Sequence, residues 1–163
     1  MSYLLDSNIL IEAKHRMPFD LFPSFWDKLK GEIQSGHIFT SVKVRSEINR
    51  GNENDELVNW TSQLPESFFV DIDGSIMMSY AQTINWANQN EQYFPAAKAE
   101  FASAEIADAF LIATAKAKDM VLVTHEVSGQ NSHKKIKIPD VADAMNVRYC
   151  TLVDMLRALT VTV

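Results

Sequence analysis

Cysteine is almost absent from this chain, since Cys150 is the only one among 163 residues. A single cysteine excludes an intrachain disulfide and any zinc site built from several cysteines. Glycine and proline are also scarce, with five of each, and no segment rich in them divides the chain. We therefore expect one domain over residues 1–163, a common size for a single globular domain.

Long apolar runs are missing as well. No stretch reaches the roughly 20 apolar residues that a membrane-spanning helix needs, and Asp6 interrupts the amino terminus before a secretory segment could develop. These absences predict a cytoplasmic protein with no membrane partner. The net charge of −6 argues against a general nucleic-acid binder, which usually has a basic surface. A negative net charge is still compatible with nucleic-acid binding if the acids are gathered at one site, where a metal ion would offset them.

Short β-like runs alternate with longer helical ones along the chain. The predicted strands cover residues 3–6, 37–40, 68–71, 120–124 and 147–150, and the predicted helices cover residues 8–16, 23–34, 42–50, 55–63, 76–88, 104–118 and 152–159. Ser41 and Ser103 are the expected N-caps of the helices that follow them. This alternation predicts a three-layer α/β/α sandwich around a mainly parallel sheet of four or five strands.

Four acidic residues lie at positions where such a fold could bind a ligand. Asp6 ends the first strand, and Glu126 comes just after the strand 120–124. Both are expected at the carboxyl edge of the sheet, where open α/β folds bind ligands. Asp108 lies in a helix that is apolar on nearly every side, where an aspartate is costly to bury without a positive neighbour. Glu47 borders apolar residues in the helix after the second strand.

If these four carboxylates converge, they make a site for a hard divalent cation. Mg²⁺ or Mn²⁺ binds through a few carboxylates and keeps several waters. One or two such ions can activate a water and neutralise a phosphodiester in its transition state, so hydrolysis is the expected reaction. Each acid also has a simpler interpretation: Asp6 as a helix cap, Asp108 as a hydrogen-bonded structural residue, and Glu47 and Glu126 as solvated side chains.

Other polar residues near the acids could contact a substrate. Ser7, Asn8 and Thr124 could position a water or a phosphate oxygen, although turn and strand-end residues need no such function. Lys134 belongs to the densest basic segment, residues 133–137. That segment could contact an RNA backbone or could be an ordinary charged loop.

Taken in order, four segments resemble the motifs of PIN domains. Residues 4–8 resemble the opening strand that ends in an aspartate, and residues 45–48 match the position of the second acid. Residues 107–113 resemble the helix of the third acid, and residues 122–126 resemble the segment of the fourth. The fourth acid is usually aspartate, so Glu126 departs from the pattern. The His125–Glu126 pair, with residues 134–139, further resembles an uncharacterised PIN-like branch of bacteria and archaea.

The resemblance implies a Mg²⁺- or Mn²⁺-dependent endoribonuclease, similar to the VapC-like toxin ribonucleases of toxin–antitoxin pairs. It implies that the catalytic and metal-binding residues are Asp6, Glu47, Asp108 and Glu126, with Glu126 completing a second metal site or orienting a water. A small antitoxin protein would block this site, and the nuclease would form a homodimer.

Two alternatives remain open. Residues 68–75 resemble the aspartate-x-aspartate loop of haloacid-dehalogenase-like phosphatases, in which Asp71 would attack phosphorus and Asp73 would act as acid and base. That loop normally lies near the amino terminus, and Asp73 is explained more simply as the cap of the next helix. The second alternative is a PIN-like binding module that has lost its activity.

Overall fold

A parallel sheet forms the centre of the computed structural model, which describes residues 1–51 and 55–163. Its five strands follow the order β3-β2-β1-β4-β5, and every neighbouring pair is parallel. The strands are β1 (Tyr3–Leu5), β2 (Ile38–Ser41), β3 (Phe69–Val70), β4 (Val121–Val123) and β5 (Tyr149–Cys150). Each predicted strand is therefore present, with its ends shifted by no more than the usual uncertainty of such boundaries.

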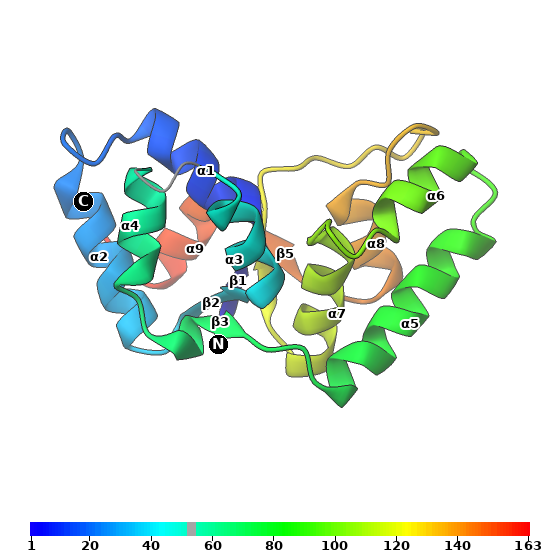
Figure 1. The fold of residues 1–163 in the computed structure, drawn as a ribbon, viewed down its shortest axis with the longest axis horizontal. Helices are drawn as coiled ribbons and strands as arrows, with labels where there is room; N and C mark the ends of the chain where they lie inside the picture. Colours follow the sequence, from blue (N-terminus) through cyan, green and yellow to red (C-terminus); the bar gives the residue numbers. More distant parts are fainter. Residues whose placement is uncertain (52–54) are drawn as a thin grey trace.

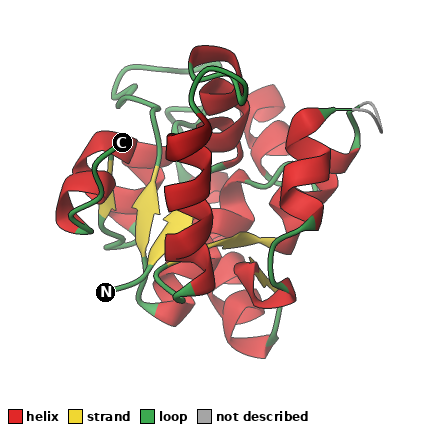
Figure 2. Cartoon of the chain, turned by 90° about the vertical axis from the view of Figure 1, so that its left-hand side faces the viewer, coloured by secondary structure: helices red, strands yellow, loops and turns green. Residues whose placement is uncertain are grey.

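Helices cover both faces of this sheet. They are α1 (Ser7–Arg16), α2 (Pro23–Gln34), α3 (Val42–Asn49), α4 (Glu56–Ser62), α5 (Gly74–Gln89), α6 (Pro95–Phe101), α7 (Asp108–Lys118), α8 (Ile138–Ala144) and α9 (Leu152–Ala158), with a 3₁₀ turn, η1, at Glu66–Phe68. Helices α2, α4 and α9 lie to the left of the sheet in Figure 1, and α5 to α8 lie to its right. The side view in Figure 2 shows the strands between the helical layers. The predicted three-layer α/β/α sandwich is confirmed.

Helix α7 is buried between the sheet and α5. Residues 109–115 are all buried, because α7 packs against β2 and β4 on one side and α5 on the other. Tyr80 of α5 stacks on Phe110 with ring centroids 4.2 Å apart. Since α7 leads into the parallel strand β4, it runs antiparallel to the strands, and its first residue lies at their carboxyl edge. None of the described helices is both long and apolar enough to cross a bilayer.

The prediction for the start of this helix is wrong. Helix α7 begins at Asp108 rather than at residue 104, and Ser103 does not cap it. Residues 103–106 form a turn in which the Ile106 N–H donates to the Ser103 carbonyl over 3.1 Å. Glu105 therefore precedes the helix and is not part of its first turn. Helices α6 and α8 were not predicted, although a proline in the first turn of each was the available signal.

Candidate active site

The central strands β1 and β4 bring Asp6 close to Thr124. The two strands pair in parallel with Leu5 opposite Val123, and the Asp6 N–H donates to the Val123 carbonyl over 2.9 Å. The residues that follow the two strands therefore leave the carboxyl edge of the sheet at the same level. The Thr124 hydroxyl Oγ1 donates to Asp6 Oδ2 over 3.0 Å. This hydrogen bond joins the first acidic motif to the fourth.

Asp6 is a buried carboxylate, with only 1% of the residue exposed. The Ser7 hydroxyl donates to Asp6 Oδ1 over 3.3 Å. The Asn8 backbone N–H of α1 also favours the charged form of Asp6, although its contact does not reach the geometry of a full capping hydrogen bond. Burial raises the pKa of Asp6 to about 6, the Thr124 hydrogen bond opposes this rise, and the charge of Glu126 adds to it. Helix capping alone does not account for a carboxylate held in this way.

Asp108 is the first residue of α7, not a residue of its interior. A carboxylate is favourable at this end of a helix because the amide dipoles point their positive ends toward it. Burial nevertheless raises the pKa of Asp108 to about 7, and the negative charges of Asp6, Glu126 and Glu47 add to the rise. Lys135 acts in the opposite direction. The four predicted acids therefore interact electrostatically at one place, the carboxylate cluster.

Glu47 and Glu126 complete the carboxylate cluster in different ways. Glu47 Oε1 accepts a hydrogen bond of 2.9 Å from the Ala107 N–H, so a side chain of α3 satisfies a backbone donor at the start of α7. The Glu126 N–H donates to the Thr124 hydroxyl over 3.1 Å. Glu126 Oε1 is buried and has no hydrogen-bond partner among the described residues. A buried carboxylate oxygen without a donor is costly, and a cation would satisfy it.

These properties fit a divalent cation of the Mg²⁺ or Mn²⁺ type. Carboxylate oxygens are the ligands that such hard ions prefer. The pKa values of Asp6 and Asp108 are raised first by burial and then by the negative charge of neighbouring acids, and a bound cation would oppose both effects. Within residues 1–51 and 55–163, no group of three His, Cys, Asp or Glu side chains already has the spacing of a metal site. The acids form a cluster of charge, not a preformed coordination shell.

The predicted substrate-binding residues differ in their surroundings. Ser7 and Thr124 are buried, and their hydroxyls bond to Asp6. Asn8 and Lys134 are exposed, and contact of all four with a substrate stays a prediction. Sequence reasoning missed Lys135, which lines a small cavity together with Asp108. The only available signal was the charge of the basic segment, which does not distinguish Lys135 from its neighbour.

The phosphatase-like loop lies away from the carboxylate cluster. Asp73 Oδ1 accepts a hydrogen bond of 2.9 Å from the Ile76 N–H, which confirms Asp73 as the N-cap of α5. The same carboxylate pairs with Lys118, which ends α7, whereas Asp108 begins that helix. Asp73 thus has a structural role at the opposite end of α7, and nothing about it favours the phosphatase alternative.

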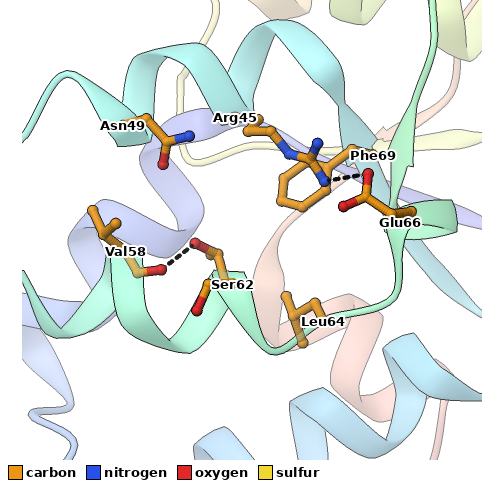
Figure 3. Close-up of a pocket in the computed structure, with 8 residues that line it drawn as sticks. Arg45, Asn49, Val58, Ser62, Leu64, Glu66 and Phe69 are labelled. Carbon is orange, nitrogen blue, oxygen red and sulfur yellow. Dashed lines mark hydrogen bonds and ion pairs between the residues drawn. The ribbon is translucent and has the colours of Figure 1, made fainter. Parts of the chain in front are cut away.

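A larger pocket lies beside α3 and α4, with a volume of about 450 Å³ (Figure 3). Its cation, Arg45, lies over the Phe69 ring, 3.9 Å from the guanidinium carbon to the ring centroid. Arg45 Nη2 also pairs with Glu66 Oε2 over 2.9 Å. Glu47 is two residues from Arg45 on the same helix, which directs the two side chains to nearly opposite sides. The pocket is therefore separate from the carboxylate cluster, and its positive charge already has a partner.

Replacing Thr124 by valine tests the hydrogen bond that holds Asp6. The Thr124→Val variant should raise the pKa of Asp6 by about one unit, because a hydrogen bond to a charged group stabilises the charged form by ~1.5 kcal/mol or more. Carboxyl-carbon NMR titration of the metal-free protein measures this change. The matched control is Thr114→Val, since the Thr114 hydroxyl is equally buried but donates to the Phe110 carbonyl. An Asp6 titration that is the same in both variants would contradict the assignment.

Comparisons with known proteins agree with this fold. The model of the family described as "Domain of unknown function (DUF4411)" matches residues 3–163, and no curated protein matches the chain. The crystal structure of VapBC2 from Rickettsia felis, bound to a DNA fragment from their promoter, is similar with a TM-score of 0.57. It has 15% identity, and the match covers 93% of this chain and 98% of that chain.

The crystal structure of FitAcB from Neisseria gonorrhoeae is similar with a TM-score of 0.52. It has 19% identity, and the match covers 90% of this chain and 95% of that chain. At these identities the likeness concerns the fold. Both similarities agree with the α/β/α architecture that the alternation of strands and helices predicts.

Proposed function

This chain belongs to the DUF4411 family, and we propose that it is a metal-dependent endoribonuclease that hydrolyses RNA phosphodiester bonds. The observation that carries the proposal is the carboxylate cluster at the carboxyl edge of the sheet. There, Asp6 and Asp108 have pKa values raised to about 6 and about 7, and Glu126 has a buried oxygen without a partner among the described residues. A site with this excess of negative charge is suited to a divalent cation, which can in turn bind a phosphodiester.

In this proposal Asp6, Glu47, Asp108 and Glu126 hold Mg²⁺ or Mn²⁺. When bound, the ion supplies the positive charge that activates a water and stabilises the transition state of hydrolysis. Thr124 and Ser7 fix the orientation of the Asp6 carboxylate through their hydrogen bonds. Preorganised ligands of this kind lower the cost of assembling the site when the substrate arrives.

Two further side chains, Glu47 and Lys135, act on Asp108 and on the charge around it. Glu47 holds the first turn of α7 through the Ala107 N–H, which positions Asp108. Lys135 shares a cavity with Asp108, and its positive charge lowers the pKa of Asp108 against the effect of the acids. Its ammonium group is placed to attract an RNA phosphate and to offset the repulsion between that phosphate and the acids.

Toxin function and an antitoxin partner belong to the same proposal. They are supported by the four motifs, which resemble those of VapC-like toxins, and by the similarity of the fold to the VapBC2 and FitAcB structures. The preference for RNA over DNA rests on the motif resemblance. In a cell, we expect a partner protein to cover the carboxylate cluster until cleavage is needed.

A cleavage assay with the purified protein tests the proposal. Structured RNA, unstructured RNA and single-stranded DNA are incubated with Mg²⁺, with Mn²⁺ or with EDTA. We expect RNA to be cut in either metal and to stay intact in EDTA, because the acids alone cannot neutralise the phosphodiester. A well-folded protein that cuts no RNA in either metal would instead favour an inactive PIN-like binding module.

A further inference from the structure

Two aromatic rings stack on the surface where the segment after β4 meets the turn between α5 and α6. Phe94 lies in the turn between α5 and α6, and His133 lies in the segment that connects β4 to α8. Their ring centroids are 5.5 Å apart and their planes differ by 22°. Phe94 is 50% exposed, and His133 is exposed as well. Burial in the core therefore does not explain this pair.

Backbone hydrogen bonds hold the two rings in place. The Phe94 N–H donates to the His133 carbonyl over 2.9 Å, and His133 Nδ1 donates to the Gln92 carbonyl over 2.7 Å. The Gln92 side-chain amide donates in turn to the carbonyls of Gln130 and Ser132 over 2.7 and 2.8 Å. Because both segments are already ordered, a ligand that stacks on the rings pays little entropy for fixing them.

The charge around the rings suits a polyanion. Residues 127–139 contain the three lysines Lys134, Lys135 and Lys137 and no acid, in a chain whose net charge is −6. The acids on the neighbouring elements are Glu91 in the α5–α6 turn, Glu100 in α6, which lines the cavity of Lys135 and Asp108, and Asp140 in α8. The Asp140 carboxylate is already engaged, because it accepts hydrogen bonds from the Ser128 hydroxyl and the Gly129 N–H. In Figure 1 the segment after β4 runs from the carboxyl edge of the sheet toward α6, and the hydrogen bond between the Phe94 N–H and the His133 carbonyl joins it to the start of that helix. It therefore connects Asp108, through Lys135, to the stacked rings.

We propose that Phe94 and His133 form a stacking platform for an unpaired base of single-stranded RNA whose backbone runs along Lys134 and Lys135 toward the carboxylate cluster. The proposal rests on the proposed nuclease function and specifies its substrate class. Every base has a π face, so stacking on aromatic side chains tolerates any sequence. Bases inside a duplex stack on one another and present no free face, so the platform selects unpaired RNA.

Binding of a short single-stranded RNA that carries 2-aminopurine, in EDTA to prevent cleavage, tests the platform. The Phe94→Ala variant should bind this RNA about tenfold more weakly than the wild type and should lose the fluorescence quenching that stacking causes. Phe94→Trp should keep both. The matched control is Phe22→Ala, which removes another exposed phenylalanine, next to α2 on the other side of the sheet (Figure 1). Duplex RNA of the same sequence should bind equally to all variants.

Several results would overturn the platform. One is equal binding of single-stranded RNA by the Phe94→Ala and Phe22→Ala variants. Another is an equal loss of duplex binding, since that would reflect charge or folding. A third is a wild type that is a dimer in solution and becomes a monomer on Phe94→Ala with unchanged RNA binding. In that case a second copy of the chain, and not RNA, would cover the rings of the wild type.

Cleavage measured in parallel separates the two proposals. If binding depends on Phe94 but the wild type cuts no RNA in either metal, the platform stands and the nuclease assignment fails. If the wild type cuts RNA while binding is independent of Phe94, the nuclease assignment stands and the platform is removed.

Discussion

The Asp108→Asn variant is expected to cut RNA at least about a hundredfold more slowly than the wild type in Mg²⁺ or Mn²⁺. Removing a metal ligand costs several kcal/mol of transition-state stabilisation. Asn has the same shape as Asp and keeps one oxygen acceptor, so the start of α7 should be retained. Cleavage rates at saturating metal, measured beside circular dichroism spectra, separate loss of chemistry from loss of fold.

The stability of the same variant gives an independent test of the electrostatics. In EDTA near neutral pH, the neutral side chain removes the repulsion that Asp108 experiences from Asp6, Glu126 and Glu47. We therefore expect Asp108→Asn to melt at the same or a higher temperature than the wild type. Glu105→Gln is the matched control, because Glu105 is an exposed acid just before the same helix and should leave cleavage unchanged. Undiminished cleavage by Asp108→Asn would remove Asp108 from the proposed site.

The metal-free protein is expected to become less stable as the pH rises from about 4 to about 7. The pKa values of Asp6 and Asp108 are raised in the folded state from 3.8 to about 6 and about 7. In this pH range the folded state therefore binds more protons than the unfolded state, and the free energy of unfolding falls with increasing pH. For Asp6 alone the loss is roughly 3 kcal/mol, at about 1.36 kcal/mol per pKa unit. Urea denaturation in EDTA at several pH values measures it.

Metal and mutation should both flatten this pH dependence. Saturating Mg²⁺ binds the ionised cluster of the folded state, so it should restore stability most strongly above pH ~7. The Asp108→Asn variant should show a shallower decline in EDTA, because one of the two titrating carboxyls is gone. A metal-free wild type whose stability is constant or rises over this pH range would contradict the raised pKa values.

Local patterns in the sequence were enough to predict the sheet and most of the helices. Tyr3–Leu5 and Val121–Val123 are short apolar runs because central strands of a sheet covered on both faces are buried on both sides. Ser41 predicted the start of α3 correctly, since its hydroxyl accepts from the Lys43 N–H. The positions of Asp6 and Glu126 after strands followed from the same patterns. In a parallel sheet, these positions share one edge.

Local sequence patterns did not predict the start of α7 correctly. Alanine-rich sequence before Asp108 favours a helix by intrinsic propensity, yet the Ala107 N–H bonds to Glu47, a residue 60 positions earlier. A contact over that distance along the chain depends on how α3 packs beside α7. Tertiary structure therefore moved Asp108 from a predicted helix interior to a helix end, where its carboxylate faces the other acids.

The sequence by itself determined the fold class, the order of the strands along the chain and which acids reach the carboxyl edge, because burial and periodicity are properties of short segments. Only the tertiary structure decided how the site is arranged. It brought Lys135 rather than Lys134 beside Asp108, joined Thr124 to Asp6 and stacked His133 on Phe94. Each of these contacts joins residues from separate elements, and packing in three dimensions sets both their distances and the shared electric field that shifts their pKa values.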